Sequence, residues 1–106
     1  MQDANSQTPA DSRRIERVDN LNQQALDFKK TDPTKIQGVA QEALNLAESI
    51  GYQYGIAMSS ILLGRAALIA SDYPLVYTYA TTANNIFIAL GNEKKQIDCL
   101  HLLITL

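Results

Sequence analysis

Cys99 and His101 are the residues whose chemistry is best suited to catalysis, and the chain has one of each. A thiol beside an imidazole can act as a nucleophile activated by its base. Both lie in the apolar segment CLHLLITL, which has helical spacing. Side chains two residues apart on a helix point about 200° apart, so this pair cannot meet. A zinc site needs three or four ligands, so these two residues predict no metal either.

Two further patterns could carry chemistry, and both are weak. Gly51 and Gly55 lie four residues apart, but no strand precedes them and no Lys-Ser/Thr pair follows, as a phosphate-binding loop requires. Glu42 and Glu48 are six residues apart on a solvated helix face, which does not favour an acid–base pair. We therefore expect no catalysis and no cofactor. A small enzyme with an unrecognised site that depends on His101 is the remote alternative.

The composition argues against several classes of partner. A formal net charge of -2 and a pI of about 5.2 provide no basic surface for nucleic acid or anionic lipid. The most apolar stretch, residues 55–70, contains Arg65 and is shorter than the roughly 20 residues that a membrane-spanning helix needs. The start, MQDANSQTPADS, is polar and lacks the apolar core of a signal peptide. We expect a cytoplasmic location, with the periplasm as the alternative if a signal peptide has been removed.

Charge is distributed unevenly along the chain. Between Ser49 and Asn92 only Arg65 and Asp72 are charged, whereas both ends carry ordinary mixed charge. Such a segment is either well buried or presents an uncharged surface that meets another molecule.

The elements that must position these residues repeat at an offset of 40 residues. The matched pairs include Asp32/Asp72, Ala40/Ala80, Ala43/Ala83, Asn45/Asn85 and Gly51/Gly91. Within each unit, an acid that can cap a helix comes first and a glycine that can end one comes last. Repetition at a fixed period of this length is typical of stacked helical hairpins.

Between these start and stop signals the apolar spacing is helical. It predicts helices over about 10–29, 33–50, 53–70, 73–90 and from 93 to 106. The expected fold is all-α: antiparallel helix hairpins stacked as a solenoid of about two repeats, plus a fifth terminal helix. We place a flexible tail at 1–9 and one helical domain at 10–106. Its units are repeat 1 (about 10–51), repeat 2 (about 52–91) and a partial repeat or capping helix (92–106).

The spacing resembles the tetratricopeptide repeat. Leu63-Gly64 matches the Leu-Gly of the family's helix A, Asp72-Tyr73 matches its turn, and Ala80 and Ala83 match the small pair of helix B. Val76 and Ser60 depart from the family pattern, and the period is 40 rather than the usual 34. A period near 40 resembles repeats of bacterial signalling proteins, which lie beside a diguanylate cyclase, a kinase or a DNA-binding module. The resemblance implies a protein–protein interaction module, the sensory or regulatory N-terminal part of such a protein.

In that family the helices A line a concave groove that holds peptides or partner helices. Carried over by position, the groove is Val18, Leu21, Ala25, Phe28, Met58, Ile61, Arg65, Leu68 and His101. A groove that is apolar with one cation suits a protein or peptide partner with an apolar or amphipathic segment, and disfavours the chaperone tails that need several basic residues. The alternative is that the helical array itself covers these side chains.

Self-association is a second class of function, because the last helix is strongly apolar. A homodimer could form through Leu100, Leu103 and Leu106, and Tyr77 is offset from the buried stripe of its helix. A stand-alone adaptor is a related alternative. Tyr73 and Tyr79 are expected to pack into the turn and the core.

Overall fold

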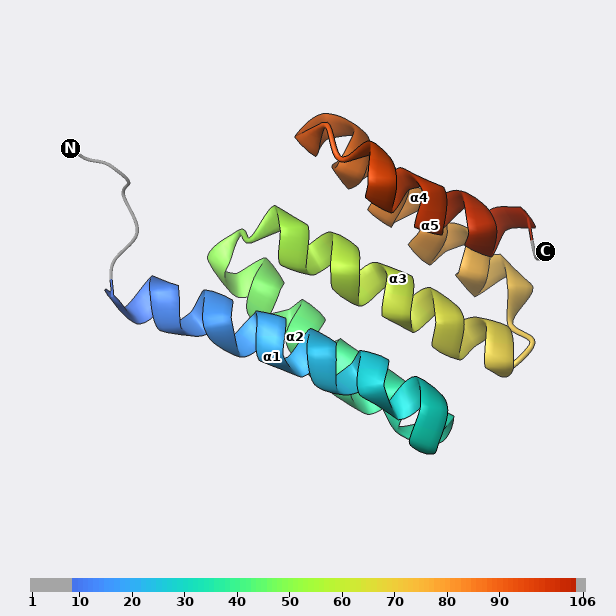
Figure 1. Ribbon diagram of the computed structural model, residues 1–106, viewed down its shortest axis with the longest axis horizontal. Helices are drawn as coiled ribbons and strands as arrows, with labels where there is room; N and C mark the ends of the chain where they lie inside the picture. The colour runs from blue at the N-terminus through green and yellow to red at the C-terminus, as the bar shows by residue number, and fades with distance from the viewer. Residues whose placement is uncertain (1–8, 105–106) are drawn as a thin grey trace.

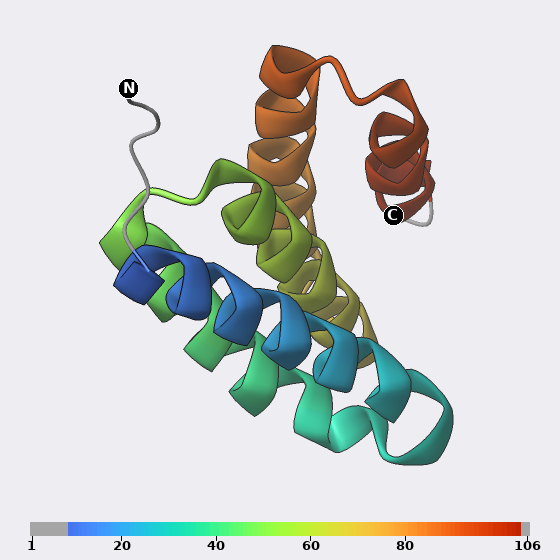
Figure 2. The same cartoon turned by 60° about the vertical axis from the view of Figure 1, so that its left-hand side comes forward.

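A computed structural model describes residues 9–104, which form five α-helices and no strand (Figures 1 and 2). The helices are α1 (Pro9–Thr31), α2 (Ile36–Ile50), α3 (Gln53–Ile69), α4 (Tyr73–Leu90) and α5 (Glu93–Ile104), with a short 3₁₀ helix, η1 (Pro33–Lys35), before α2. The all-α hairpin prediction is confirmed. Almost all of the predicted tail, as well as Leu106, lies outside the described residues.

Two helix starts have a side-chain cap, and one of them is the predicted Asp72. The Asp72 carboxylate accepts a hydrogen bond from the Leu75 amide at 3.3 Å, and the Asn92 side chain accepts one from the Lys95 amide at 3.1 Å. Asp32 makes no such bond to the backbone and accepts instead from the Thr34 hydroxyl. The second α-helix therefore begins at Ile36, after one 3₁₀ turn, and not at residue 33.

Three helix ends share one geometry. Gly51 and Gly91 have φ angles of 68° and 70°, and Ser71 has 60°, all in the left-handed region. After each of them, the next amide donates back to a helix carbonyl: Tyr52 to Ala47, Asp72 to Ala67 and Asn92 to Phe87, each at 2.9 Å. This is the Schellman stop, which satisfies carbonyls that the helix end would leave unpaired.

The repeat seen in the sequence is visible in the burial of α2 and α4. Position by position, residues 36–49 and 76–89 have the same degree of burial, and the helices differ only at Ile50 and Leu90. Ile36, Ala40 and Ala43 are fully buried, as are their counterparts Val76, Ala80 and Ala83. The two helices therefore occupy equivalent places in two successive hairpins.

Helix α3 lies at the centre of the molecule. Each helix packs on the next in the chain, and α3 also contacts α1 and α5 (Figure 2). One core cluster joins α1, α2 and α3, and a second joins α3, α4 and α5. This explains why α3 is apolar nearly all round, because it has neighbours on both sides.

Gly64 and Gly55 let neighbouring elements approach α3 closely. A Cβ atom at Gly64 would lie 3.2 Å from Leu102 Cδ1 of α5 and 3.5 Å from Tyr79 Cβ of α4. A Cβ atom at Gly55 would lie 2.6 Å from the Tyr52 ring and 2.7 Å from Val18 Cγ1 of α1. The first contact fits the close approach predicted from the Leu-Gly pair. The second was not predicted.

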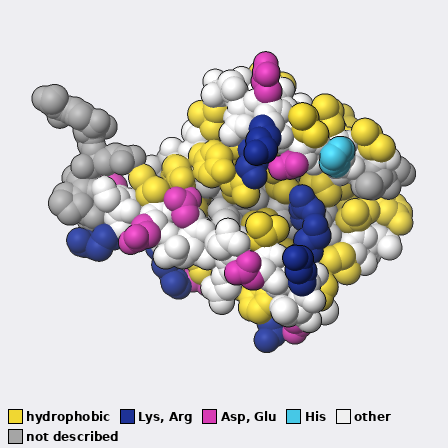
Figure 3. Space-filling model, in the orientation of Figure 1, with side chains coloured by type: hydrophobic (Ala, Val, Ile, Leu, Met, Phe, Trp, Pro, Cys, Tyr) yellow, Lys and Arg dark blue, Asp and Glu magenta, His cyan; other side chains and the backbone are white. Residues whose placement is uncertain are grey.

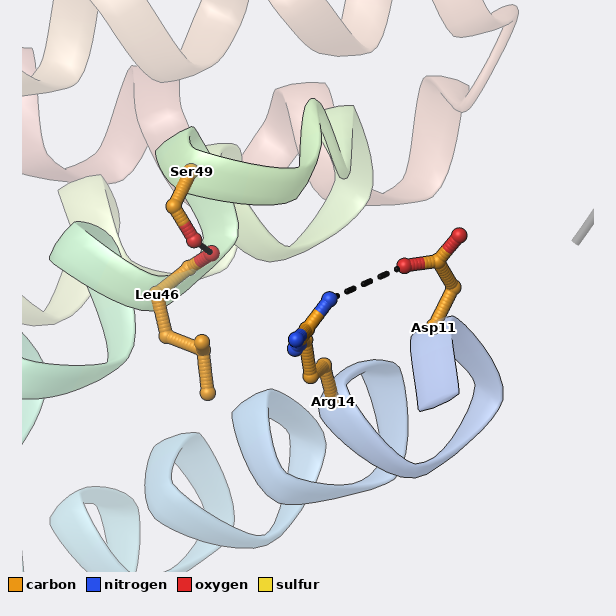
Figure 4. Close-up of polar contacts among 4 residues, drawn as sticks. All are labelled: Asp11, Arg14, Leu46 and Ser49. Carbon is orange, nitrogen blue, oxygen red and sulfur yellow. Dashed lines mark hydrogen bonds and ion pairs between the residues drawn. The ribbon is translucent and has the colours of Figure 1, made fainter. Parts of the chain in front are cut away.

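The open end of the first hairpin brings the start of α1 beside the end of α2 (Figure 4). The polar contacts drawn there are local: Arg14 donates to Asp11 at 3.3 Å, and the Ser49 hydroxyl donates to the Leu46 carbonyl at 2.7 Å. Between the helices, Arg17 donates to Glu42 at 3.1 Å, but both side chains are more than half exposed. Exposed ion pairs contribute little, so the apolar interface holds this hairpin together.

Candidate functional site

Two hollows open along the face of α3 that is flanked by α1 and α5, the side toward the viewer in Figure 3. The α1–α3 hollow has a volume of about 290 Å³ and is lined by Asp19, Asn22, Gln23, Leu26, Tyr54 and Met58. The α3–α5 hollow has a volume of about 170 Å³ and is lined by Arg65, Leu68, Asp98, His101 and Leu102. We call the surface that carries both hollows the inner face.

Helix α3 contributes to both hollows from one stripe of side chains. Tyr54, Met58, Arg65 and Leu68 fall within about 80° of one another on a helical wheel, at 100° per residue. Tyr54 and Met58 face the α1 side, while Arg65 and Leu68 face the α5 side. The hollows are therefore consecutive along one helix, as a binding site for an elongated ligand requires.

Four of the residues predicted for the groove line this face: Met58, Arg65 and Leu68 of α3 and His101 of α5. His101 is exposed, and the three α3 side chains are partly buried. Phe28 is partly buried as well, but it packs against the first core cluster, with the Lys35 ammonium 5.5 Å from its ring centre. Phe28 lines neither hollow.

The other predicted groove residues are in the core. Val18 and Ala25 have no exposed surface, Leu21 is 4% exposed and Ile61 is 3% exposed. Their assignment to a ligand-contacting surface was wrong. Among residues 9–104, helix α1 packs only against α2, η1 and α3, so its apolar stripe faces them, and the groove wall is the adjoining polar flank.

Sequence reasoning missed the α1 wall by one residue along the helix. The wall consists of Asp19, Asn22, Gln23 and Leu26, whereas the prediction used Val18, Leu21 and Ala25. One residue is about 100° of rotation, enough to move a side chain from the core to the groove. Asn22, a polar residue one turn from Val18 and from Leu26 on the helix, was the signal that could have revealed the rotation.

A polar contact is buried beneath the α1–α3 hollow. Asn22 donates to the Gly55 carbonyl at 3.4 Å and accepts from the Ser59 hydroxyl at 2.9 Å. Nearby, the Tyr52 hydroxyl donates to Asp19 at 2.9 Å. Burial and this hydrogen bond raise the pKa of Tyr52 above its ordinary range. These bonds fix the wall of the hollow against α3.

Arg65 lines the α3–α5 hollow and has one buried donor that is unsatisfied. Its Nε atom is buried and has no hydrogen-bond partner in the described part of the chain. Asp98 lines the same hollow but pairs with Lys95, whose Nζ lies 3.7 Å from the Asp98 carboxylate. A buried donor without an acceptor is costly, so this position favours a ligand that carries an acceptor.

Cys99 and His101 do not form a catalytic pair. Cys99 is fully buried in the second core cluster, whereas His101 is exposed on the inner face. Burial and the nearby Asp98 carboxylate raise the pKa of Cys99 to about 11, so its thiol is protonated at neutral pH. Within residues 9–104 no group of three or more His, Cys, Asp and Glu side chains is placed to hold a metal ion.

A third hollow lies on the opposite side of α3, between α2 and α4. It measures about 160 Å³ and is bounded mainly by Leu63, Ala66, Ala67, Leu75 and Tyr79, with Gln37 and Asp72 at its edges. Leu63 and Ala67 in its wall are buried, whereas Ala70, Leu75 and both polar residues are exposed. No charged side chain other than the capping residue Asp72 reaches it.

The residues predicted for self-association lie on two different helices and differ in exposure. Leu100 is 47% exposed on α5 and Tyr77 is 58% exposed on α4, whereas Leu103 is partly buried against the second core cluster. Ile97 and Ile104, which the sequence did not single out, are more exposed than Leu100.

Tyr73 and Tyr79 of α4 differ in how far they are buried. Tyr79 is partly buried against the first core cluster, as expected. Tyr73 is 50% exposed, so its predicted packing was wrong, because it stands at the first position of α4, where the chain still faces solvent.

Comparison with known proteins gives no relative: no family model, no curated protein and no solved structure matches the chain. Among the described residues, no helix has the length and apolar character needed to cross a membrane. Function therefore has to be argued from the inner face itself.

Proposed function

We propose that this chain is a non-catalytic protein-interaction module built from helix hairpins of the tetratricopeptide type. The observation that carries the proposal is the inner face, where two hollows follow each other along α3 and combine apolar and polar side chains with a single cationic side chain from that helix, Arg65. Every second helix is also in contact, α1 with α3 and α3 with α5. These contacts support the stacked arrangement that the resemblance implies. By the same resemblance, we propose a regulatory role in a bacterial signalling protein.

The chemistry of the face defines the partner. Leu26, Tyr54 and Met58 offer apolar surface at one end, and Arg65 with His101 offers donors at the other. The matching ligand is an apolar or amphipathic segment of a protein that carries an acceptor, a carboxylate or a free carbonyl, placed to meet the Arg65 guanidinium. Hydrogen bonds to a charged acceptor are the stronger ones, so an acidic residue is favoured at that place.

A displayed library of random peptides, selected on the 106-residue chain, tests the proposal. Selected peptides should be rich in large apolar residues with an acidic residue at one side. Met58→Asp and Arg65→Gln should each weaken their binding at least tenfold, while Ile69→Glu, an exposed position outside both hollows, should leave it unchanged.

Circular dichroism of each variant separates loss of binding from loss of fold. Peptides that bind equally well to Met58→Asp and Arg65→Gln, with both variants folded, would show that the inner face is not the binding site.

A further inference from the structure

The outer side of α5 carries a stripe of large apolar side chains. Ile97, Leu100 and Ile104 are 52%, 47% and 78% exposed. They are spaced three and four residues apart, which places them in one line along the helix, opposite the buried Cys99 and Leu102. We call these three residues the α5 stripe.

The internal repeat shows that this side of the helix is normally covered. At the 40-residue offset, Ile97, Leu100 and Ile104 correspond to Ala57, Ser60 and Gly64 of α3. All three α3 residues are buried; Ala57 belongs to the core cluster formed with α4, and Gly64 lies against Tyr79 of α4. In α5 the equivalent surface has no covering helix among the described residues.

The residue types indicate which kind of helix fits there. Ala57, Ser60 and Gly64 are small, and at Gly64 both α5 and α4 approach closely, whereas Ile and Leu at the matching places of α5 hold a neighbour at the ordinary distance between helices. Ile-x-x-Leu-x-x-x-Ile is the alternation of a and d positions in a two-stranded coiled coil. A helix with the same stripe is therefore a better complement than a second helix of the α4 type.

The charges on and beside the α5 stripe allow it to face the same stripe of a second copy. A two-fold interface brings each surface patch against its own copy, so a charged patch would repel itself. The α5 stripe has no charged residue, and Glu93 and Lys94 beside it have opposite signs. The preceding helix, α4, has no charged residue at all.

We infer that two copies of this chain associate through their α5 stripes, which form a short pair of helices about a two-fold axis. Each copy supplies three large side chains from a 12-residue helix. A standard interface uses about 20–30 residues a side, so this dimer is weak and dissociates on dilution. The stripe is separate from the inner face, so a ligand there and a second copy at α5 do not compete for the same residues.

Sedimentation velocity of the whole 106-residue chain, from micromolar to millimolar concentration, tests the inference. The wild type should shift from the monomer mass to twice that mass. Leu100→Glu and Ile97→Glu should each stay monomeric throughout with unchanged helicity, because both positions are exposed. The matched control, Ile69→Glu, changes a residue that is 58% exposed at the end of α3 and should dimerise like the wild type.

Three results would overturn the inference: a wild type that stays monomeric at every concentration, a Leu100→Glu chain that dimerises normally, or a mass that grows beyond two copies. Met58→Asp on the inner face should leave dimerisation intact, so a failure here is distinguishable from a failure of the proposed ligand site.

Crosslinking gives an independent check of the geometry. In a Cys99→Ser background, Leu100→Cys should form a disulfide-linked dimer under mild oxidation at a rate that rises with concentration. The equivalent buried serine, Ser59, donates to Asn22, whose counterpart here is Leu62, so circular dichroism of the Cys99→Ser background must first show that it folds. Ile69→Cys in the same background should link much more slowly, and equal rates would contradict pairing through α5.

Discussion

Gly55 lies against Tyr52 and Val18 with no room for a side chain, whereas nothing lies within 4 Å of a Cβ atom at Gly38. Gly55→Ala should lower the free energy of unfolding by about 1–2 kcal/mol, because a cost of overpacking of roughly 1–3 kcal/mol exceeds the gain in helix propensity. Gly38→Ala should raise it by up to about 1 kcal/mol. Urea denaturation of both variants measures the difference, and a stabilising Gly55→Ala would disprove the close contact.

Cys99 makes the stability depend on pH in the alkaline range. Burial and Asp98 raise the pKa of Cys99 from 9.0 to about 11, so the folded chain keeps the thiol proton to higher pH than the unfolded chain does. The free energy of unfolding should therefore be unaffected by this group below pH 9 and fall by about 2 kcal/mol as pH rises from 9 to 11.

Urea titrations across that range, on the wild type and on Cys99→Ser, measure the contribution of the thiol. The serine variant should lose less stability with rising pH. Tyr52 has a raised pKa as well, so the comparison is best made in a Tyr52→Phe background. Identical pH profiles for the two chains would show that Cys99 is not the group responsible.

At the scale of helices, a buried hydrogen bond between Asn22 and Ser59 joins α1 to α3. The equivalent positions in the next unit are both apolar. Asn22 and Ser59 correspond, at the 40-residue offset, to Leu62 and Cys99. Asn22→Leu and Ser59→Cys should each cost about 1–3 kcal/mol, because each leaves a buried polar partner unsatisfied. The double variant should cost clearly less than the sum. Chemical denaturation of all four chains gives the coupling, and additive losses would contradict the contact.

The elements were predictable where each helix carries its own signals. Gly51 and Gly91 end helices because both adopt the left-handed conformation, and Asp72 starts one because its carboxylate caps the backbone. Ser71 adopts the same left-handed conformation although it is not a glycine. Its residue type therefore did not predict that α3 ends there.

The inner face was predictable only in part, because rotation about a helix axis depends on neighbours. Met58 and Arg65 line the hollows, since α3 is packed on both sides and its free stripe is narrow. Helix α1 packs from one side, so its whole apolar stripe turned inward, and Val18 and Ala25 became core residues. Their burial follows from the packing of α1 on α2 and α3, which no local pattern encodes.

For the molecule as a whole, the helices should differ in their resistance to local unfolding. Helix α3 is covered by both hairpins, while α5 has 12 residues and an exposed outer stripe. Backbone amides of α5 should therefore exchange with deuterium first and those of α3 last, as measured by mass spectrometry on a dilute sample. At high concentration the protection of α5 should rise. Uniform exchange across all helices would contradict this order.

The stop shared by Gly51, Ser71 and Gly91 gives the chain a modular length. Gly51 and Gly91 end the two units and Ser71 joins the helices within the second, and each turn is set by the same local backbone conformation and hydrogen bond. A tandem duplication of residues 52–91 would then lengthen the molecule by one pair of helices and leave α1 and α5 as its ends. Genetic insertions and deletions of one period are thus the changes this architecture should tolerate best, whereas a shift of a few residues would break both neighbouring interfaces.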